Sequence, residues 1–264
     1  MIYGFIGLGN MASAILSGII RNGIASADDI VGSAKTKETR ERVAKQFGIR
    51  TLSSNKEVAG TSDVLFLAVK PGVLPLVIEE IRDDVSRDTL IISVAAGKTT
   101  KWLTDQFDTP VKIVRCMPNT PALVGAGCSA LCRNENVTDG ELDLALTICR
   151  SFGTAEVVSE SLMDTVGAVS GASPAYVFMF IEALADAGVK GGMPRAQTYR
   201  FAAQTVMGSG KLMLETGRHP GELKDMVTSP GGTTIEGVQV LEDEGFRGAV
   251  MDAIEAAIDK SRNL

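Results

Sequence analysis

Short strand-like hydrophobic runs alternate with helical hydrophobic spacing along the chain as far as Val158. The runs lie at residues 3–6, 29–33, 49–52, 63–69, 89–94, 111–116, 124–131 and 155–158. Between them, apolar residues recur three or four positions apart, as at Ile15, Leu16, Ile19 and Ile20. Continuous apolar strands separated by helices are typical of a parallel sheet that is covered on both faces. The pattern therefore predicts an α/β fold with a doubly wound sheet.

From residue 161 onwards the hydrophobic pattern is helical throughout. We expect a short helix over 162–170, and then a helix that begins at an N-cap Ser173 with Pro174 in its first turn. A long helix from Pro194 to Gly217, another over 220–227 and two final helices follow. The sequence therefore predicts two domains, residues 1–160 and residues 161–264.

The long helix is apolar over much of its circumference, at positions that include Phe201, Val206, Met207, Met213 and Leu214. Such a helix needs packing partners on most sides, and a domain of about a hundred residues supplies few of them. The pattern favours homodimerisation through the second domain. Core packing within one subunit is the alternative.

A glycine-rich turn follows the first strand and opens the first helix, with the sequence Gly7-Leu8-Gly9-Asn10-Met11-Ala12. In this context Gly7 makes the tight turn, and Gly9 lets a pyrophosphate approach the backbone. The small Ala12 allows the helix to pack closely on the strand. The motif predicts a Rossmann-like domain that binds a dinucleotide.

The second strand ends at Ser33 without the acid that NAD enzymes place on the ribose 2′-hydroxyl. Lys35 and Lys37 follow instead, next to the hydroxyls of Ser33 and Thr36. A 2′-phosphate fits among these groups, so the sequence favours NADPH, with NADH as the second choice. Alternatively, the two lysines are only solvated charges at the start of a helix.

Three later strands end in small or proline-containing turns, at residues 68–71, 95–97 and 117–121. Ligands of open α/β sheets bind beyond the carboxyl ends of the strands, so we expect these turns to line the cofactor. Lys70 is either a cofactor contact or a solvated charge. Asn119 either orients the nicotinamide or the substrate, or serves the turn alone.

Residues 228–236 read Thr-Ser-Pro-Gly-Gly-Thr-Thr-Ile-Glu. Pro230 fixes one backbone angle, and the following glycine pair allows positive φ in a sharp turn. Thr233 and Thr234 then stand at the entry of a helix, where hydroxyls and free N–H groups point out together. This arrangement predicts an anion pocket, with an ordinary helix cap as the alternative.

Composition excludes several functions. The net charge of −6 argues against nucleic acid, which needs clustered lysines and arginines. The four cysteines lack metal or disulfide spacing, so we expect reduced, buried thiols in a cytoplasmic protein. The single histidine, His219, argues against a histidine-rich metal site, and we expect no metal. Because no apolar run approaches the roughly 20 residues of a membrane span, we expect no membrane partner.

Five segments occur in an order that resembles the pyrroline-5-carboxylate reductase family. They are the glycine loop, Ala-Val-Lys-Pro at 68–71, Arg-Cys-Met-Pro-Asn-Thr-Pro at 115–121, Ser-Gly-Ala-Ser-Pro-Ala-Tyr at 170–176, and Thr-Ser-Pro-Gly-Gly-Thr-Thr at 228–234. The last segment, followed by Gly237 and Leu241, is similar to the family signature. The resemblance implies reduction of 1-pyrroline-5-carboxylate to L-proline with NADPH or NADH. It also implies a Rossmann-like domain followed by a helical dimerisation domain, with dimers that often assemble into decamers.

The resemblance also implies site residues. Those that contact the cofactor would be Ile6, Gly7, Leu8, Gly9, Asn10, Met11, Ser33, Lys35, Asn55, Ala68, Val69, Lys70, Pro71, Ala95, Ala96, Met117, Pro118 and Asn119. Those that contact the substrate would be Ser173, Gly231, Gly232, Thr233 and Thr234, with Ser173 and Thr234 as the candidates for catalysis. Some members have Ser-Gly where this chain has Ala172-Ser173. Some members also have an acid where Gly217 stands, so no role is carried over to Gly217.

In such a reaction a hydride passes from the nicotinamide to the imine carbon, while the helix start holds the substrate carboxylate. No side chain is an evident general acid, so we expect the iminium form to come from solution or by protonation through water. The pocket is expected to face the cofactor across a subunit boundary. Two other functions stay open: a 3-hydroxyacid dehydrogenase of the 6-phosphogluconate type, with Lys211 as its lysine, and a non-catalytic NADP-binding sensor.

Overall fold

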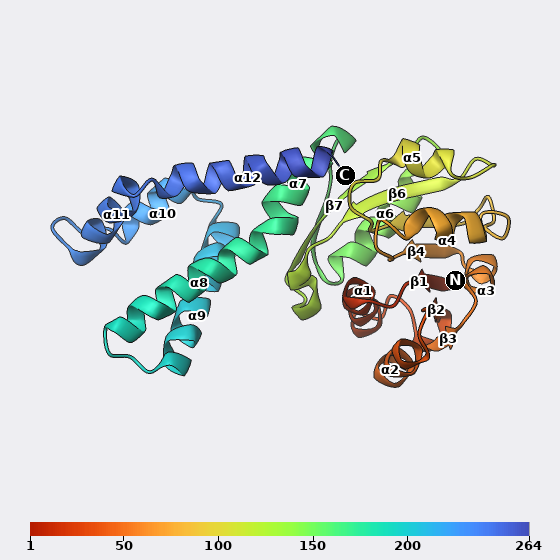
Figure 1. Ribbon diagram of the computed structural model, residues 1–264, viewed down its shortest axis with the longest axis horizontal. Coiled ribbons are helices and arrows are strands. Elements are labelled where there is room, and N and C mark those ends of the chain that lie inside the picture. The colour runs from red at the N-terminus through yellow and green to blue at the C-terminus, as the bar shows by residue number, and fades with distance from the viewer. Residues whose placement is uncertain (264) are drawn as a thin grey trace. The chain divides into compact units, whose positions relative to one another are not determined.

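In the computed structural model, which describes residues 1–263, eight strands form one sheet in the order β3-β2-β1-β4-β5-β6-β7-β8 (Figure 1). Their bounds are β1 Tyr3–Ile6, β2 Ile30–Ser33, β3 Arg50–Leu52, β4 Val64–Leu67, β5 Leu90–Ser93, β6 Lys112–Met117, β7 Gly127–Arg133 and β8 Gly153–Val157. Each strand overlaps a segment that the hydrophobic pattern predicts, although β6 and β7 end one or two residues later and β8 begins two residues earlier. The doubly wound α/β fold is therefore confirmed.

The direction of the last two strands differs from the fully parallel sheet that the pattern predicts. Strands β1 to β6 are parallel, but β7 pairs antiparallel with β6, and β8 is parallel to β7. A parallel crossover needs a dozen or more residues, and the connection from Pro118 to Ala126 is shorter than that. The chain therefore reverses at this point and returns beside β6.

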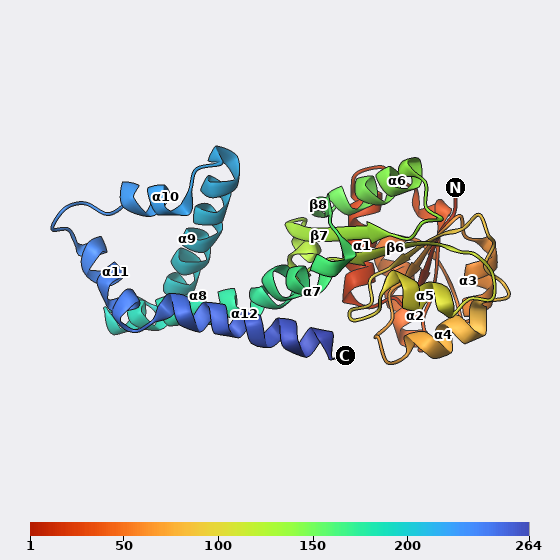
Figure 2. The ribbon, with the colours of Figure 1, turned by 90° about the horizontal axis from the view of Figure 1, so that it is seen from above.

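Helices cover both faces of the sheet (Figures 1 and 2). One face packs against α1 Asn10–Arg21, α2 Lys37–Phe47 and α6 Asp139–Arg150, and the other against α3 Asn55–Thr61, α4 Leu74–Ile81 and α5 Thr100–Asp105. Successive strand residues alternate between the faces. On the first face the rings of Phe5 and Phe66 stack at 4.5 Å, whereas Ile6 and Leu67 pack in the core of the second.

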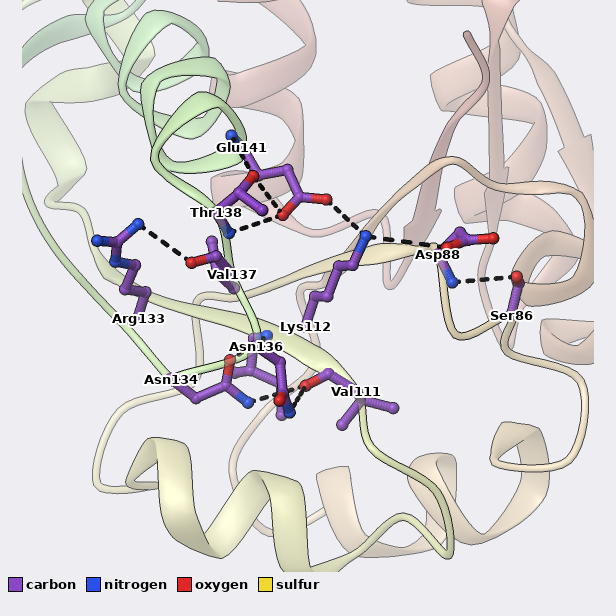
Figure 3. A network of polar contacts seen from close by, with 11 residues as sticks. Ser86, Asp88, Val111, Lys112, Arg133, Asn134, Asn136, Val137, Thr138 and Glu141 are labelled. Atoms are coloured by element: carbon purple, nitrogen blue, oxygen red, sulfur yellow. Dashed lines mark hydrogen bonds and ion pairs between the residues drawn. The ribbon is translucent and has the colours of Figure 1, made fainter.

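Polar side chains at the start of β6 contact the start of α6 and the residues just before β5 (Figure 3). The ammonium of Lys112 donates to Glu141 Oε1 at 2.7 Å and lies 4.0 Å from Asp88 Oδ1. Glu141 also accepts from the Thr138 N–H at 2.9 Å in a capping box that starts α6. Burial acts to raise the pKa of Glu141, but the bonds from Lys112 and Thr138 outweigh it and lower that pKa.

A second ionic cluster surrounds Arg115 of β6, which is 2% exposed. Its guanidinium lies 3.3 Å from Glu160 and 3.8 Å from Asp164. Ser261, near the end of the chain, donates to Asp164 at 2.8 Å. Burial, with the nearby Glu160 charge, raises the pKa of the Cys132 thiol to about 12. The cluster fastens β6 to the residues that follow β8.

The four cysteines are free thiols, as predicted. Cys116, Cys132 and Cys149 are buried, but Cys128 is exposed, which corrects the expectation that all four lie in the interior. Residues alternate between the two sides of a strand. Cys128 lies between the buried Gly127 and Ser129 of β7, so its side chain points to the other side, toward solvent.

The predicted break before Ser173 is absent, and the prediction of an N-cap at this residue is wrong. A 3₁₀ turn, Glu160–Leu162, leads into α7 Met163–Val166, a π-helical segment Gly167–Ala172 and α8 Ser173–Lys190 without interruption. Proline has no N–H for the Ser170 carbonyl one turn back, and its ring crowds that carbonyl. The wider π turn makes room for Pro174, and helices that take up such a turn continue.

The remaining helices are α9 Arg195–Thr216, α10 Pro220–Met226, α11 Thr233–Asp243 and α12 Phe246–Arg262 (Figure 2). The chain divides by its internal contacts into two units, Met1–Ala172 with the end of the chain from Ile258, and Ser173–Ala257. In the second unit α9 packs closely on α8, where a Cβ on Gly188 would lie 2.5 Å from Thr198.

Apolar side chains of the second unit are widely exposed. Phe201 and Leu214 of α9 are 59% and 81% exposed, and Phe178 and Met179 of α8 are similarly open. By length and composition alone, the helical run Glu160–Lys190 could cross a membrane, a test that core helices of soluble proteins also pass. The sequence pattern predicts no such run, because it places the start of a new helix at Ser173 and Pro174.

Candidate functional site

The turn between β1 and α1 is shaped by Gly7, whose φ is +94°. Its N–H donates to the Ser33 carbonyl at 3.0 Å, and an added Cβ would lie 2.6 Å from the Ala68 carbonyl oxygen. Only glycine fits there. Gly9 is the N-cap of α1, and a Cβ added to it would meet nothing within 4 Å. Its backbone therefore faces open space beside the free N–H groups of the first helical turn, as an anion site requires.

A cavity of about 400 Å³ lies beside this loop, and we call it the Ser33 cavity. Residues predicted to contact the cofactor line it: Ile6, Gly7, Ser33, Lys35, Asn55 and Val69. Its other walls are Ala34, Ser53, Val73, Leu76, Val77 and Glu80. The volume is in the range of small-molecule sites, and the lining combines apolar walls with a few polar groups.

Polar side chains form a chain along one wall of the Ser33 cavity. The hydroxyl of Ser33, which is buried, donates to Asn55 Oδ1 at 2.7 Å. Asn55 Nδ2 in turn donates to Glu80 Oε2 at 2.7 Å. Asn55 is thereby held from both ends. Glu80 is absent from the residues that the sequence predicts, because it lies on α4, far along the chain from the β2 turn.

Two arginines of α2 shape the same region and were not predicted. Arg40 donates to the carbonyls of Ala34 and Lys35 at 2.6 and 3.3 Å, and Arg42 donates to the Leu8 carbonyl at 3.2 Å. Arg40 thus fixes the loop that carries Lys35, and Arg42 fixes the glycine loop. The sequence signal that could have identified them is the presence of two arginines in the early turns of the helix that follows β2.

Leu8, Asn10 and Met11 lie in the glycine loop and the start of α1. The predicted cofactor residues from Ala68 to Asn119 lie at the ends of β4, β5 and β6, which are neighbours in the sheet. Lys70 is exposed, whereas Ala95 is buried. The Met117 side chain packs in a small cluster with Met163. The alternatives for Lys70 stay open.

Asn119, which follows β6, has its amide committed within the protein. Its Nδ2 donates to the carbonyl and hydroxyl oxygens of Ser170, both at 3.2 Å, and its Oδ1 accepts from the Cys128 N–H at 2.8 Å. These bonds favour the role in the turn that the sequence left open. They hold the start of β7 to the π-helical segment.

The predicted anion turn forms as the sequence indicates, within the second unit. Gly231 has a φ of +67°, and Gly232 is the N-cap of α11. Thr233 and Thr234 are the first two helical residues, and both are exposed. Because the N-cap is a glycine, no side chain caps the first N–H groups. They are available to a carboxylate or another anion.

Ser173, which the resemblance makes a candidate for catalysis, and the single histidine, His219, both lie in the second unit. Ser173 begins α8 in the same unit as the anion turn. His219 is the N-cap of α10, where its Nδ1 accepts from the Gly221 N–H at 3.1 Å. Within residues 1–263, no three His, Cys, Asp or Glu side chains gather as a metal site would require.

Two family models match parts of the chain. One, described as pyrroline-5-carboxylate reductase dimerisation, matches residues 160–264. The other, described as NADP oxidoreductase coenzyme F420-dependent, matches residues 2–97. The first covers the helical part of the chain and the second covers the glycine loop and the Ser33 cavity.

Similarity to single proteins extends over the whole chain. It is 51% identical over 261 residues to pyrroline-5-carboxylate reductase of Escherichia coli, covering 99% of this chain and 97% of that protein. The crystal structure of Plasmodium falciparum pyrroline carboxylate reductase with NADP bound has a TM-score of 0.90 and 36% identity, covering 100% of this chain and 97% of that one. The reductase of Coxiella burnetii has a TM-score of 0.92 and 36% identity, covering 99% and 97%. The chain belongs to the pyrroline-5-carboxylate reductase family.

Proposed function

We propose that this protein reduces the C=N bond of 1-pyrroline-5-carboxylate to give L-proline, the last step of proline biosynthesis, with NADPH as the reductant. The observation that carries the proposal is the similarity to reductases over 99% of the chain. That similarity includes both the dinucleotide loop and the anion turn. It disfavours a 3-hydroxyacid dehydrogenase and a non-catalytic sensor.

The residues present fit a dinucleotide. Gly9 leaves open backbone beside the N–H groups of α1, where a pyrophosphate is stabilised. Ser33, Lys35 and Asn55 offer hydroxyl, ammonium and amide groups in one cavity. When bound, the nicotinamide supplies the hydride. We assign Leu8, Asn10 and Met11 to contacts at the glycine loop, and the predicted residues from Ala68 to Asn119 to contacts along the ends of β4, β5 and β6.

We assign the substrate carboxylate to Gly231, Gly232, Thr233 and Thr234. A helix start with uncapped N–H groups and two hydroxyls can make several charge-assisted hydrogen bonds to a carboxylate. Ser173 is the further candidate, beside the ring nitrogen or the carboxylate. Holding the imine in one orientation can account for several kcal/mol of the barrier.

The sequence offers no evident acid for the imine nitrogen, and the Nδ1 of its single histidine, His219, accepts a backbone hydrogen bond. We therefore propose that the substrate binds as the iminium form, or gains its proton through water. If so, the pH profile of kcat/KM follows the ionisation of the free imine. A profile set by a protein group would contradict this step.

The chain forms a homo-oligomer with a helical dimerisation domain. A groove of about 590 Å³ between α8, α11 and α12 is lined by residues such as Tyr176, Phe180, Leu241 and Phe246, and we propose that a second subunit covers it. Three further proposals stand beside this one. The domains divide between residues 160 and 161, and the dimers assemble into a decamer. The protein is cytoplasmic and has no nucleic-acid or membrane partner.

The direct test mixes the purified protein with NADPH and pyrroline-5-carboxylate and follows the absorbance of the reduced nicotinamide. We expect loss of absorbance together with formation of proline, measured by chromatography. A protein that binds NADPH but leaves the absorbance unchanged would be the sensor rather than the reductase. Turnover of 3-hydroxyacids with NADP⁺ would instead support the dehydrogenase.

A further inference from the structure

Glu80 brings a carboxylate to the Ser33 cavity from a helix that the cofactor motif does not include. It lines the cavity together with Ser33 and Lys35, and its Oε2 accepts from Asn55 Nδ2 at 2.7 Å. NAD enzymes place an acid at the end of the second strand, where it accepts from the ribose 2′-hydroxyl. Here that strand carries no acid, and the fold supplies one from α4.

The hydrogen-bond chain fixes how this carboxylate is held. Ser33 donates to the oxygen of the Asn55 amide at 2.7 Å, so the NH₂ end of that amide faces Glu80. The bond uses one carboxylate oxygen and leaves the charge in place. In the described part of the chain, no lysine or arginine forms an ion pair with Glu80. The carboxylate, which is exposed to solvent, therefore carries a negative charge that no ion pair holds.

We propose that Glu80 influences cofactor specificity. The ammonium of Lys35 favours NADPH, and the carboxylate of Glu80 reduces that preference relative to NADH. A phosphate on the ribose carries between one and two negative charges near neutral pH and is repelled by a carboxylate in the same cavity. A 2′-hydroxyl, in contrast, can donate to that carboxylate. The inference rests on the proposed function, since it concerns the cofactor of that reaction.

The test uses two small probes, 2′,5′-ADP and 5′-AMP, which differ only in the 2′-phosphate. Their dissociation constants are measured by calorimetry on the full-length protein, with no turnover required. In E80Q the amide oxygen can still accept from Asn55, so only the charge is lost. The control is E79Q, because Glu79 is an exposed neighbour on the same helix outside the cavity lining.

We expect E80Q to bind 2′,5′-ADP about three- to tenfold more tightly than the wild type, from the loss of a nearby like charge. Binding of 5′-AMP should stay the same or weaken by up to about threefold, because a charged acceptor is lost. E79Q should change either constant by less than about twofold. Raising the salt from roughly 50 to 500 mM should shrink the effect of E80Q, since salt screens charges.

Three results would overturn the proposal: an equal change for both probes, weaker binding of 2′,5′-ADP by E80Q, or no difference between E80Q and E79Q. Weaker binding would mean that Glu80 serves to orient Asn55 for the phosphate. Failure of the reductase assay is a separate outcome. A wild type that binds both probes but does not reduce pyrroline-5-carboxylate refutes the proposed function and leaves the role of Glu80 intact.

Discussion

The side-chain amide of Asn119 donates at 3.2 Å to the carbonyl oxygen of Ser170, which in α-helical register would accept from the N–H of position 174. Position 174 is a proline and has no N–H to give. The same amide accepts from the Cys128 N–H. One asparagine thus compensates for the proline and secures the turn between β6 and β7.

Replacing Asn119 should therefore destabilise the protein. N119A leaves the part-buried Ser170 carbonyl without this partner, and an unsatisfied group of this kind costs about 1–3 kcal/mol. Urea denaturation of the unliganded protein measures the loss. In P174A the new N–H can serve the Ser170 carbonyl, so the cost of N119A should be smaller by about 1 kcal/mol in that background. Strictly additive effects would show that Pro174 and Asn119 are not coupled through Ser170.

Thr234→Ala should weaken substrate binding with little effect on the cofactor. Loss of one hydrogen bond to a charged carboxylate costs about 1.5–3 kcal/mol, so kcat/KM should fall roughly ten- to a hundredfold, mainly through KM. Steady-state kinetics and titration with NADPH measure the two effects. T228A is the control, because the Thr228 hydroxyl bonds to the Lys224 carbonyl. Equal losses of substrate and cofactor affinity would indicate a structural role for Thr234.

Lys35→Gln should raise the KM for NADPH by about tenfold and leave the KM for NADH within about twofold, because only NADPH has a phosphate for the ammonium. The matched control is K37Q, since the Lys37 side chain is 75% exposed and lies 3.5 Å from Glu41. Rates with the two cofactors at fixed substrate provide the measurement. If K35Q affected both cofactors alike, Lys35 would be the solvated charge of the alternative interpretation.

The Lys112–Glu141 pair should make stability depend on acidity. The folded-state pKa of Glu141 is lowered, so its contribution is fully present above the unfolded pKa and is lost as the pH falls through the folded value. E141Q should cost about 1–3 kcal/mol at pH 7 and progressively less below about pH 4.5. Urea unfolding at several pH values tests this, with E135Q as the exposed-carboxylate control. A cost that does not change with pH would contradict the assignment.

Phe180→Asp should disrupt the homo-oligomer. Phe180 lines the apolar groove of the second unit, and its ring lies 6.2 Å from that of Phe246. A carboxylate there would be desolvated by a partner subunit at a cost of several kcal/mol. Light scattering should show a lower mass for F180D, whereas V157D, at an exposed position of β8, should keep the wild-type mass. An unchanged mass for F180D would place the interface elsewhere.

Local patterns in the sequence determined much of this protein. The strands follow from unbroken apolar runs, and the turn at Gly7 follows from its place between a strand and a helix. The start of α11 follows from Gly231, Gly232 and the two threonines. These features depend on neighbours in the chain, and a residue type such as glycine is tied to a backbone shape that few others adopt.

Only the tertiary structure decided which distant side chains meet. Glu80 joins Asn55 because α3 and α4 pack on the same face, and Arg115 gathers two carboxylates from the residues after β8. The helix continues through Pro174 because a π turn makes room for the proline ring and because Asn119 donates to the Ser170 carbonyl in place of the missing N–H. Hydrophobic periodicity carries no information about such pairs, since each contact joins segments whose spacing in the chain is set by the fold.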